Sequence, residues 1–165
     1  MRLVSREEIV ENLETLHKTS KMIVELSGGH PPTFMLVRGP KIEAIDFTPY
    51  IEDKDLMEVM LKSYKAQDDI DVTILLTEAW ALELDAKSEL GKQIMAGEAE
   101  APIPTDSPDR KEILFYLVET RSGKTYTAQA DIIRNGDQTV LGPLQMMADE
   151  KAELRGRFVG SKLNS

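Results

Sequence analysis

IDVTILLTEAWALELD, residues 70–85, is the segment around which the fold is organised. Apolar side chains recur there at every second position, which puts them on one face of an extended strand: Ile70, Val72, Ile74, Leu76, Trp80, Leu82 and Leu84. Polar residues such as Asp71 and Thr73 occupy the other face. One acid, Glu78, interrupts the apolar face two positions before Trp80, the only tryptophan. The pattern predicts a long strand with one face packed inward.

Two helices and a hairpin are predicted before this strand. The capping pattern from Ser5 to Glu8 starts a helix over residues 5–27, and the Gly and Pro residues of 28–32 end it. Residues 33–38 and 41–47 read as two strands joined by the turn at 39–40. A helix over residues 53–67 follows, with acids in its first turn. The helix at 5–27 carries a narrow apolar stripe, which favours docking on the sheet over pairing with another subunit.

After residue 85 the pattern becomes irregular and then returns to strands. Residues 97–110 form an acidic loop rich in Gly, Pro and Ala, after a short helix that ends near residue 94. Residues 111–120 are apolar on both faces, which predicts a central strand covered on both sides. An alternating strand over residues 125–133 follows, and Asn135-Gly136 predicts a hairpin to a short strand at 139–141. The pattern is compatible with a final helix over residues 144–154, before a basic tail at 155–165 that is expected to fray.

These elements predict an α+β fold in a single domain over residues 1–165. Strands follow one another through short turns, so the sheet is expected to be mostly antiparallel, with about five to six strands. The sheet core spans residues 33–134. An N-terminal helix precedes it, and the helix of residues 53–67 lies between the second and third strands.

Composition excludes several classes of function. The chain has no cysteine, so it forms neither disulfides nor thiolate metal sites. Its net charge of −9 opposes general binding of nucleic acid, which requires a positive field. No apolar run approaches the length of a membrane span, and the first residues lack the apolar core of a signal peptide. We therefore expect a soluble, cytoplasmic protein with no membrane and no nucleic-acid partner.

Common catalytic and metal-binding motifs fail when their spacing is checked. Gly123-Lys124-Thr125 resembles the end of a phosphate-binding loop, but Val118 stands where the first glycine is needed, and a strand follows where a helix is needed. The only histidines, His17 and His30, have no metal-ligand spacing. The acidic clusters lack the ligand order of an EF-hand. The sequence therefore predicts no metal and no cofactor.

The candidate ligand or ion-pair site consists of Glu78, Trp80, Asp46 and His30. If the alternation is unbroken, the Glu78 carboxylate points to the side of Trp80, and a buried carboxylate requires a partner, a proton or a cavity. Structural explanations compete with a functional one: a β-bulge, exposure at the end of the sheet, or neutralisation by Arg110, Arg121 or Arg134. In the functional hypothesis, Glu78 and Trp80 line a cleft and residues 97–110 form its lid.

Two classes of function follow. The first is a non-catalytic protein-binding or assembly module with an acidic surface, which includes self-association as a homodimer. The second is a small-ligand-binding protein or an enzyme that uses Glu78 as a buried acid or base in a cleft beside Trp80, helped by Asp46 or His30. We favour the first, because no catalytic constellation survives inspection.

Overall fold

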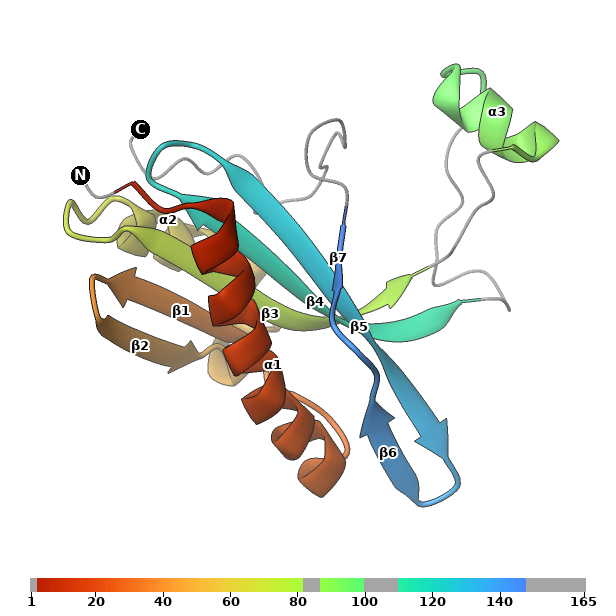
Figure 1. Cartoon of the computed structure of the whole chain (residues 1–165), viewed down its shortest axis with the longest axis horizontal. Helices are drawn as coiled ribbons and strands as arrows, with labels where there is room; N and C mark the ends of the chain where they lie inside the picture. The colour runs from red at the N-terminus through yellow and green to blue at the C-terminus, as the bar shows by residue number, and fades with distance from the viewer. Residues whose placement is uncertain (1–2, 82–86, 100–109, 148–165) are drawn as a thin grey trace.

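The chain is an α+β protein built on one antiparallel sheet (Figure 1). The structure, a computed structural model, describes residues 3–81, 87–99 and 110–147. Within them the order of neighbouring strands is β2-β1-β3-β4-β5-β6, and β7 pairs with β5. Every pairing is antiparallel, as the short turns of the sequence predicted. The strands are β1 (Thr33–Arg38), β2 (Lys41–Asp46), β3 (Val72–Ala81), β4 (Lys111–Thr120), β5 (Thr125–Asn135), β6 (Gln138–Leu141) and β7 (Gln145–Met146).

The helices begin and end close to where the sequence places them. They are α1 (Arg6–Ser27), α2 (Lys54–Lys65) and α3 (Glu89–Met95), with a 3-10 turn at Thr48–Tyr50. The Ser5 side chain accepts a hydrogen bond from the Glu8 N–H at 3.2 Å, which caps α1. Gly28 ends α1 in the left-handed conformation, with φ at 80°, and its N–H donates to the Val24 carbonyl. The helix expected over residues 53–67 corresponds to α2.

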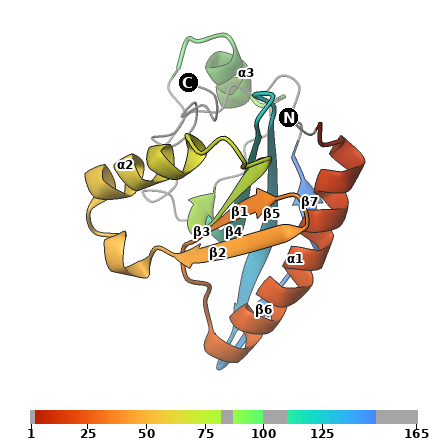
Figure 2. The same cartoon turned by 90° about the vertical axis from the view of Figure 1, so that its left-hand side faces the viewer.

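The sheet carries one long helix on each face, α1 on one and α2 on the other (Figure 2). The core under α1 joins the inner side chains of that helix to strand β1 and to strands β3 to β6. Its largest fully buried members are Ile9, Leu13, Val24, Leu76, Leu114, Tyr116 and Leu141. The core under α2 contains Phe34, Leu36, Phe47, Met57, Leu61, Ile70, Leu75 and Leu117. Two separate cores explain why β4 is apolar on both faces.

The alternation predicted over residues 70–85 holds within β3, but Ile70, just before the strand, belongs to the core under α2. Residues 82–85 lie outside the described residues. Val72, Ile74 and Leu76 are buried under α1, and Glu78 and Trp80 follow on the same face. Glu78 lies opposite Leu114, and Trp80 lies opposite Glu112 in β4. Strand β1 ends its pairing with β3 at the Thr33–Leu76 pair, so Glu78 and Trp80 extend beyond it. The apolar face therefore ends in exposed residues where β3 extends beyond β1.

The helix considered for residues 144–154 is wrong at its start, because Gln145–Met146 form β7. Strand β6 reaches only as far along β5 as Ile132, so the outer edge of β5 is open beyond that point. Met146 pairs with Ala128 in this open stretch, and the Met147 N–H donates to the Thr127 carbonyl at 2.9 Å. The unpaired backbone of β5 thus draws the chain into a strand. Residues 148–154 of that range lie outside the described residues.

The tail at 155–165 and residues 100–109 of the acidic loop also lie outside the described residues. The short helix expected before the loop is α3. Among the helices that the structure describes, none is both long enough and apolar enough to cross a membrane.

Candidate functional site

Glu78 holds the turn that follows α1. Its carboxylate accepts a hydrogen bond from the His30 backbone N–H at 2.6 Å. A Cβ atom on Gly29 would lie 2.7 Å from the same carboxylate oxygen, so glycine is needed there for this close approach. The Glu78 side chain is exposed. The end of the sheet exposes this acid, so it is not the buried group that the acid-base hypothesis assumed.

Arg134, on β5, forms hydrogen bonds in the same region, at the C-terminus of α1. Its guanidinium donates to both oxygens of Glu112, with the shortest contact at 2.8 Å, and to the Gly28 carbonyl at 2.9 Å. The hydrogen bonds to Glu112 raise the pKa of Arg134, and the charge of Glu78 adds to this. Glu78, Glu112 and Arg134 form what we call the Arg134 cluster. It ties the C-terminus of α1 to β3, β4 and β5.

Of the other predicted site residues, His30 and Asp46 lie near Glu78, whereas Trp80 lies in a different place. His30 is 8% exposed, and its Nδ1 lies 2.8 Å from the Pro31 carbonyl. Hydrogen bonds from the Thr48 hydroxyl and N–H lower the pKa of the Asp46 carboxyl, and the charge of His30 contributes further. Glu78, His30 and Asp46 are therefore neighbours, and the hydrogen bonds described for them are with local backbone groups and the Thr48 hydroxyl.

Trp80 contributes to a different hollow. The Arg110 guanidinium lies 4.4 Å from the centroid of the Trp80 ring, and 42% of Trp80 is exposed. Trp80 lines a hollow of about 450 Å³ together with Ala79, Ala81, Lys111, Ile113, Phe115, Gln129 and Met147. Glu78 does not line it. The structure thus separates the acid from the tryptophan that the sequence hypothesis placed in one cleft.

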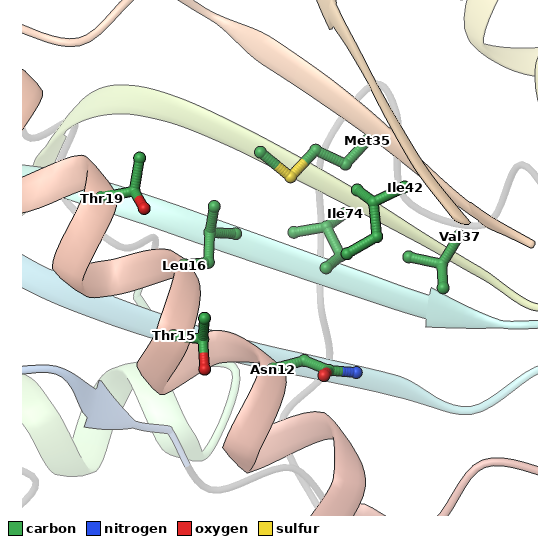
Figure 3. A pocket seen from close by; sticks show the side chains of 8 residues that line it. All are labelled: Asn12, Thr15, Leu16, Thr19, Met35, Val37, Ile42 and Ile74. Carbon is green, nitrogen blue, oxygen red and sulfur yellow. The ribbon is translucent and has the colours of Figure 1, made fainter. Parts of the chain in front are cut away.

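A second, uncharged groove lies between α1 and the first hairpin. It has a volume of about 310 Å³ and is lined by Asn12, Thr15, Leu16, Thr19, Met35, Val37, Ile42 and Ile74. We call it the α1–β2 groove. Figure 3 shows the α1 side chains along one wall and those of β1, β2 and β3 along the other. None of the eight lining residues carries a charge, in a chain whose net charge is −9.

The groove continues toward the β1–β2 turn. A neighbouring hollow of about 440 Å³ shares Asn12, Val37 and Ile42 and adds Glu8, Gly39 and Pro40. Ile42 forms part of both, and 63% of it is exposed. Strand β2 also has a neighbour on one side only among the described strands. An apolar lining beside an open sheet edge is typical of a surface that contacts another chain.

Sequence reasoning missed this groove as a site. The signal that could have found it is the uncharged flank of α1, where Asn12, Thr15 and Thr19 lie beside the buried stripe. Ile42 gives a second signal, because it is an apolar residue on the face of β2 that also carries the exposed Asp46.

The arrangement defines an α+β protein with a helix on each face of an antiparallel sheet and an uncharged groove on one face. Within the described residues, no group of three or more His, Asp or Glu side chains is arranged to hold a metal ion. The chain belongs to the bacteriophage lambda protein ea47 family, whose sequence model matches residues 1–155. No curated protein and no solved structure matches the chain.

Proposed function

We propose that this chain is a non-catalytic protein-binding or assembly module and that its partner occupies the α1–β2 groove. The observation that supports the proposal is the lining of the groove, which is uncharged and includes the 63% exposed Ile42. Full burial of an isoleucine stabilises a complex by roughly 1.5–3 kcal/mol relative to an exposed side chain. Ile42 can supply much of that on binding, because most of its surface is still accessible.

The contacts of the Glu78 carboxylate also support a binding module over an enzyme. Glu78 is exposed and accepts the His30 N–H, and its neighbour Arg134 is engaged by Glu112. These contacts support a role for the Glu78 carboxylate in holding a turn. An acid-base role for Glu78 in a cleft beside Trp80 remains the alternative hypothesis, and it requires a ligand that binds there.

The test is affinity capture of partners from the lysate of the native host, with nuclease treatment, at low and high salt. We expect a stoichiometric protein that the wild-type chain retains and the Ile42→Glu variant loses. Val59→Glu is the matched control, because Val59 lies on α2 and has the same 63% exposure as Ile42. Retention at high salt agrees with an uncharged contact.

Three results contradict the proposal. Capture by Ile42→Glu at the wild-type level would move the contact away from the groove. Capture of no protein, combined with binding of a small molecule that Glu78→Gln abolishes, would favour the alternative. Loss of a captured protein at high salt would indicate that the partner binds the acidic surface. The groove would then have no role in binding.

A further inference from the structure

A second stripe runs along α1 beside the one that packs on the sheet. Its members are Asn12, Thr15, Thr19, Met22 and Leu26, at alternating spacings of three and four residues. This spacing keeps side chains on one flank of a helix and is the spacing of paired helices. All five residues are exposed, and Met22 and Leu26 are 63% and 85% exposed. The stripe continues the helical wall of the α1–β2 groove, to which it contributes Asn12, Thr15 and Thr19.

The stripe is the uncharged side of an otherwise charged exposed surface. Except for Ser27, charged residues occupy the remaining exposed positions of α1, among them Glu7, Glu14 and Lys21. A chain with a net charge of −9 repels a second copy of itself over most of its surface. Repulsion is weaker where two copies present this uncharged stripe to each other.

We propose that two copies of this chain associate through antiparallel pairing of their α1 helices across this stripe. The inference rests on the proposed assembly function and names the partner as a second copy of the chain. Antiparallel pairing about a twofold axis sets small residues against large ones. Thr15 faces the partner's Leu26, and Thr19 faces the partner's Met22. The twofold axis repeats both contacts in the opposite sense. The four residues of each helix thus form four layers of paired side chains.

Charges beside the stripe fit the same register. Lys18 and Glu25 border it, seven residues apart on the same side of α1. In the register that pairs Thr19 with the partner's Met22, Lys18 lies nearest to the partner's Glu25. The twofold axis makes two such opposite-charge contacts. The pairing thus agrees with both the sizes and the charges of the side chains.

Light scattering coupled to size-exclusion chromatography tests the association directly. We expect a mass of about 37 kDa, twice the 18.5 kDa of one chain. Met22→Glu should give the mass of one chain, whereas the control Val59→Glu, at a site with the same 63% exposure, should remain a dimer. A wild-type mass of 18.5 kDa at every concentration up to about 200 µM would overturn the proposal. The Kd of the dimer would then be weaker than the micromolar range. A Met22→Glu variant that remains dimeric would overturn it too.

Charge exchange and cross-linking test the register. Lys18→Glu should weaken the dimer about tenfold, since it replaces two attractive contacts with repulsive ones. The double variant Lys18→Glu with Glu25→Lys should restore it, and failure to do so would overturn the antiparallel register. The chain has no cysteine, so introduced cysteines report contacts without interference. A mixture of Thr15→Cys and Leu26→Cys chains should form a disulfide-linked dimer.

Thr15→Cys chains alone should not cross-link, because the two Thr15 positions lie about 16 Å apart along the paired helices at a rise of 1.5 Å per residue. Efficient cross-linking of Thr15→Cys alone would indicate a different register and overturn the proposal. The experiments distinguish a failure of the dimer from a failure of the proposed function. A wild-type monomer whose captured partner is lost on Ile42→Glu would overturn the dimer and preserve the binding function.

Discussion

The buried ion pair between Lys65 and Glu119 gives a stability prediction that the structure makes quantitative. Lys65 Nζ lies 3.0 Å from Glu119 Oε1, and the two residues are 3% and 7% exposed. Lys65→Met removes the cation and leaves the buried carboxylate without it. Removing one member of a buried pair costs about 3–5 kcal/mol of the free energy of unfolding. For a chain of this length that corresponds to a decrease of roughly 6–20 °C in Tm.

The size of this loss should depend on pH. Burial raises the pKa of the Glu119 carboxyl, and the charge and hydrogen bond of Lys65 oppose that rise. Lys65→Met removes the opposition, so the pKa of Glu119 in the folded variant rises further. Folding then takes up a proton between the unfolded and folded pKa values, and stability falls as the pH rises through that window. The deficit of Lys65→Met should therefore be largest at neutral pH and should shrink as the pH falls toward 4.5, the ordinary pKa of the carboxyl.

Urea denaturation of wild type and variants at pH 7.5 and pH 5 measures both effects. Lys62→Met is the matched control on the same helix, because Lys62 lies 3.1 Å from Glu58 and its side chain is 57% exposed. That exposed pair should contribute less than about 1 kcal/mol. The double variant Lys65→Met with Glu119→Leu should recover most of the loss, since it leaves no buried charge. A deficit below about 1 kcal/mol at neutral pH, or one that is the same at both pH values, would refute the reasoning.

Two further predictions concern the α1 face of the sheet. Gly29→Ala should lower the free energy of unfolding by about 1 kcal/mol, because a Cβ displaces the Glu78 carboxylate from the His30 N–H; the cost should largely vanish in a Glu78→Ala background, and equal costs in both backgrounds would contradict the contact. Burial raises the pKa of Tyr116 to about 12 from an ordinary 10, so its contribution to stability should be lost as the pH rises from 10 through 12. Tyr116→Phe should lack this alkaline loss in denaturation experiments above pH 9, and an unchanged pH slope would show that Tyr116 does not cause it.

Local signals made most of the fold predictable. The capping pattern at Ser5 and the left-handed Gly28 place both ends of α1. Asn135-Gly136 marks the turn between β5 and β6, where Asn135 pairs with Gln138 across Gly136, whose φ is 60°. Each of these features depends only on residues within a few positions in the chain. Strand β7 does not: Gln145 and Met146 are extended because β6 leaves part of the β5 edge unpaired.

The candidate site was harder to predict, because it depends on how far one element extends past another. The alternation placed Glu78 on the correct face of β3, but its exposure follows from β1 ending at the pair between Thr33 and Leu76. The α1–β2 groove depends on the lateral position of α1 over the sheet. That position is set by contacts with strands more than ninety residues away, such as the bond between His17 Nδ1 and the Tyr116 hydroxyl. No local pattern reports it.

The contacts that hold α1 have a consequence for synthesis of the chain. The residues that hold α1 come late in the chain: Lys21 Nζ lies 3.4 Å from the Leu141 carbonyl, and Arg134 donates to the Gly28 carbonyl. A ribosome completes α1 first, yet it adds those partners more than a hundred residues later. On the nascent chain, the apolar side of α1 therefore lacks these contacts until β6 has emerged from the ribosome. Contacts of such long separation also slow folding, because loop closure precedes the gain from packing. The first helix to be made therefore completes its set of contacts only after β6 has been made.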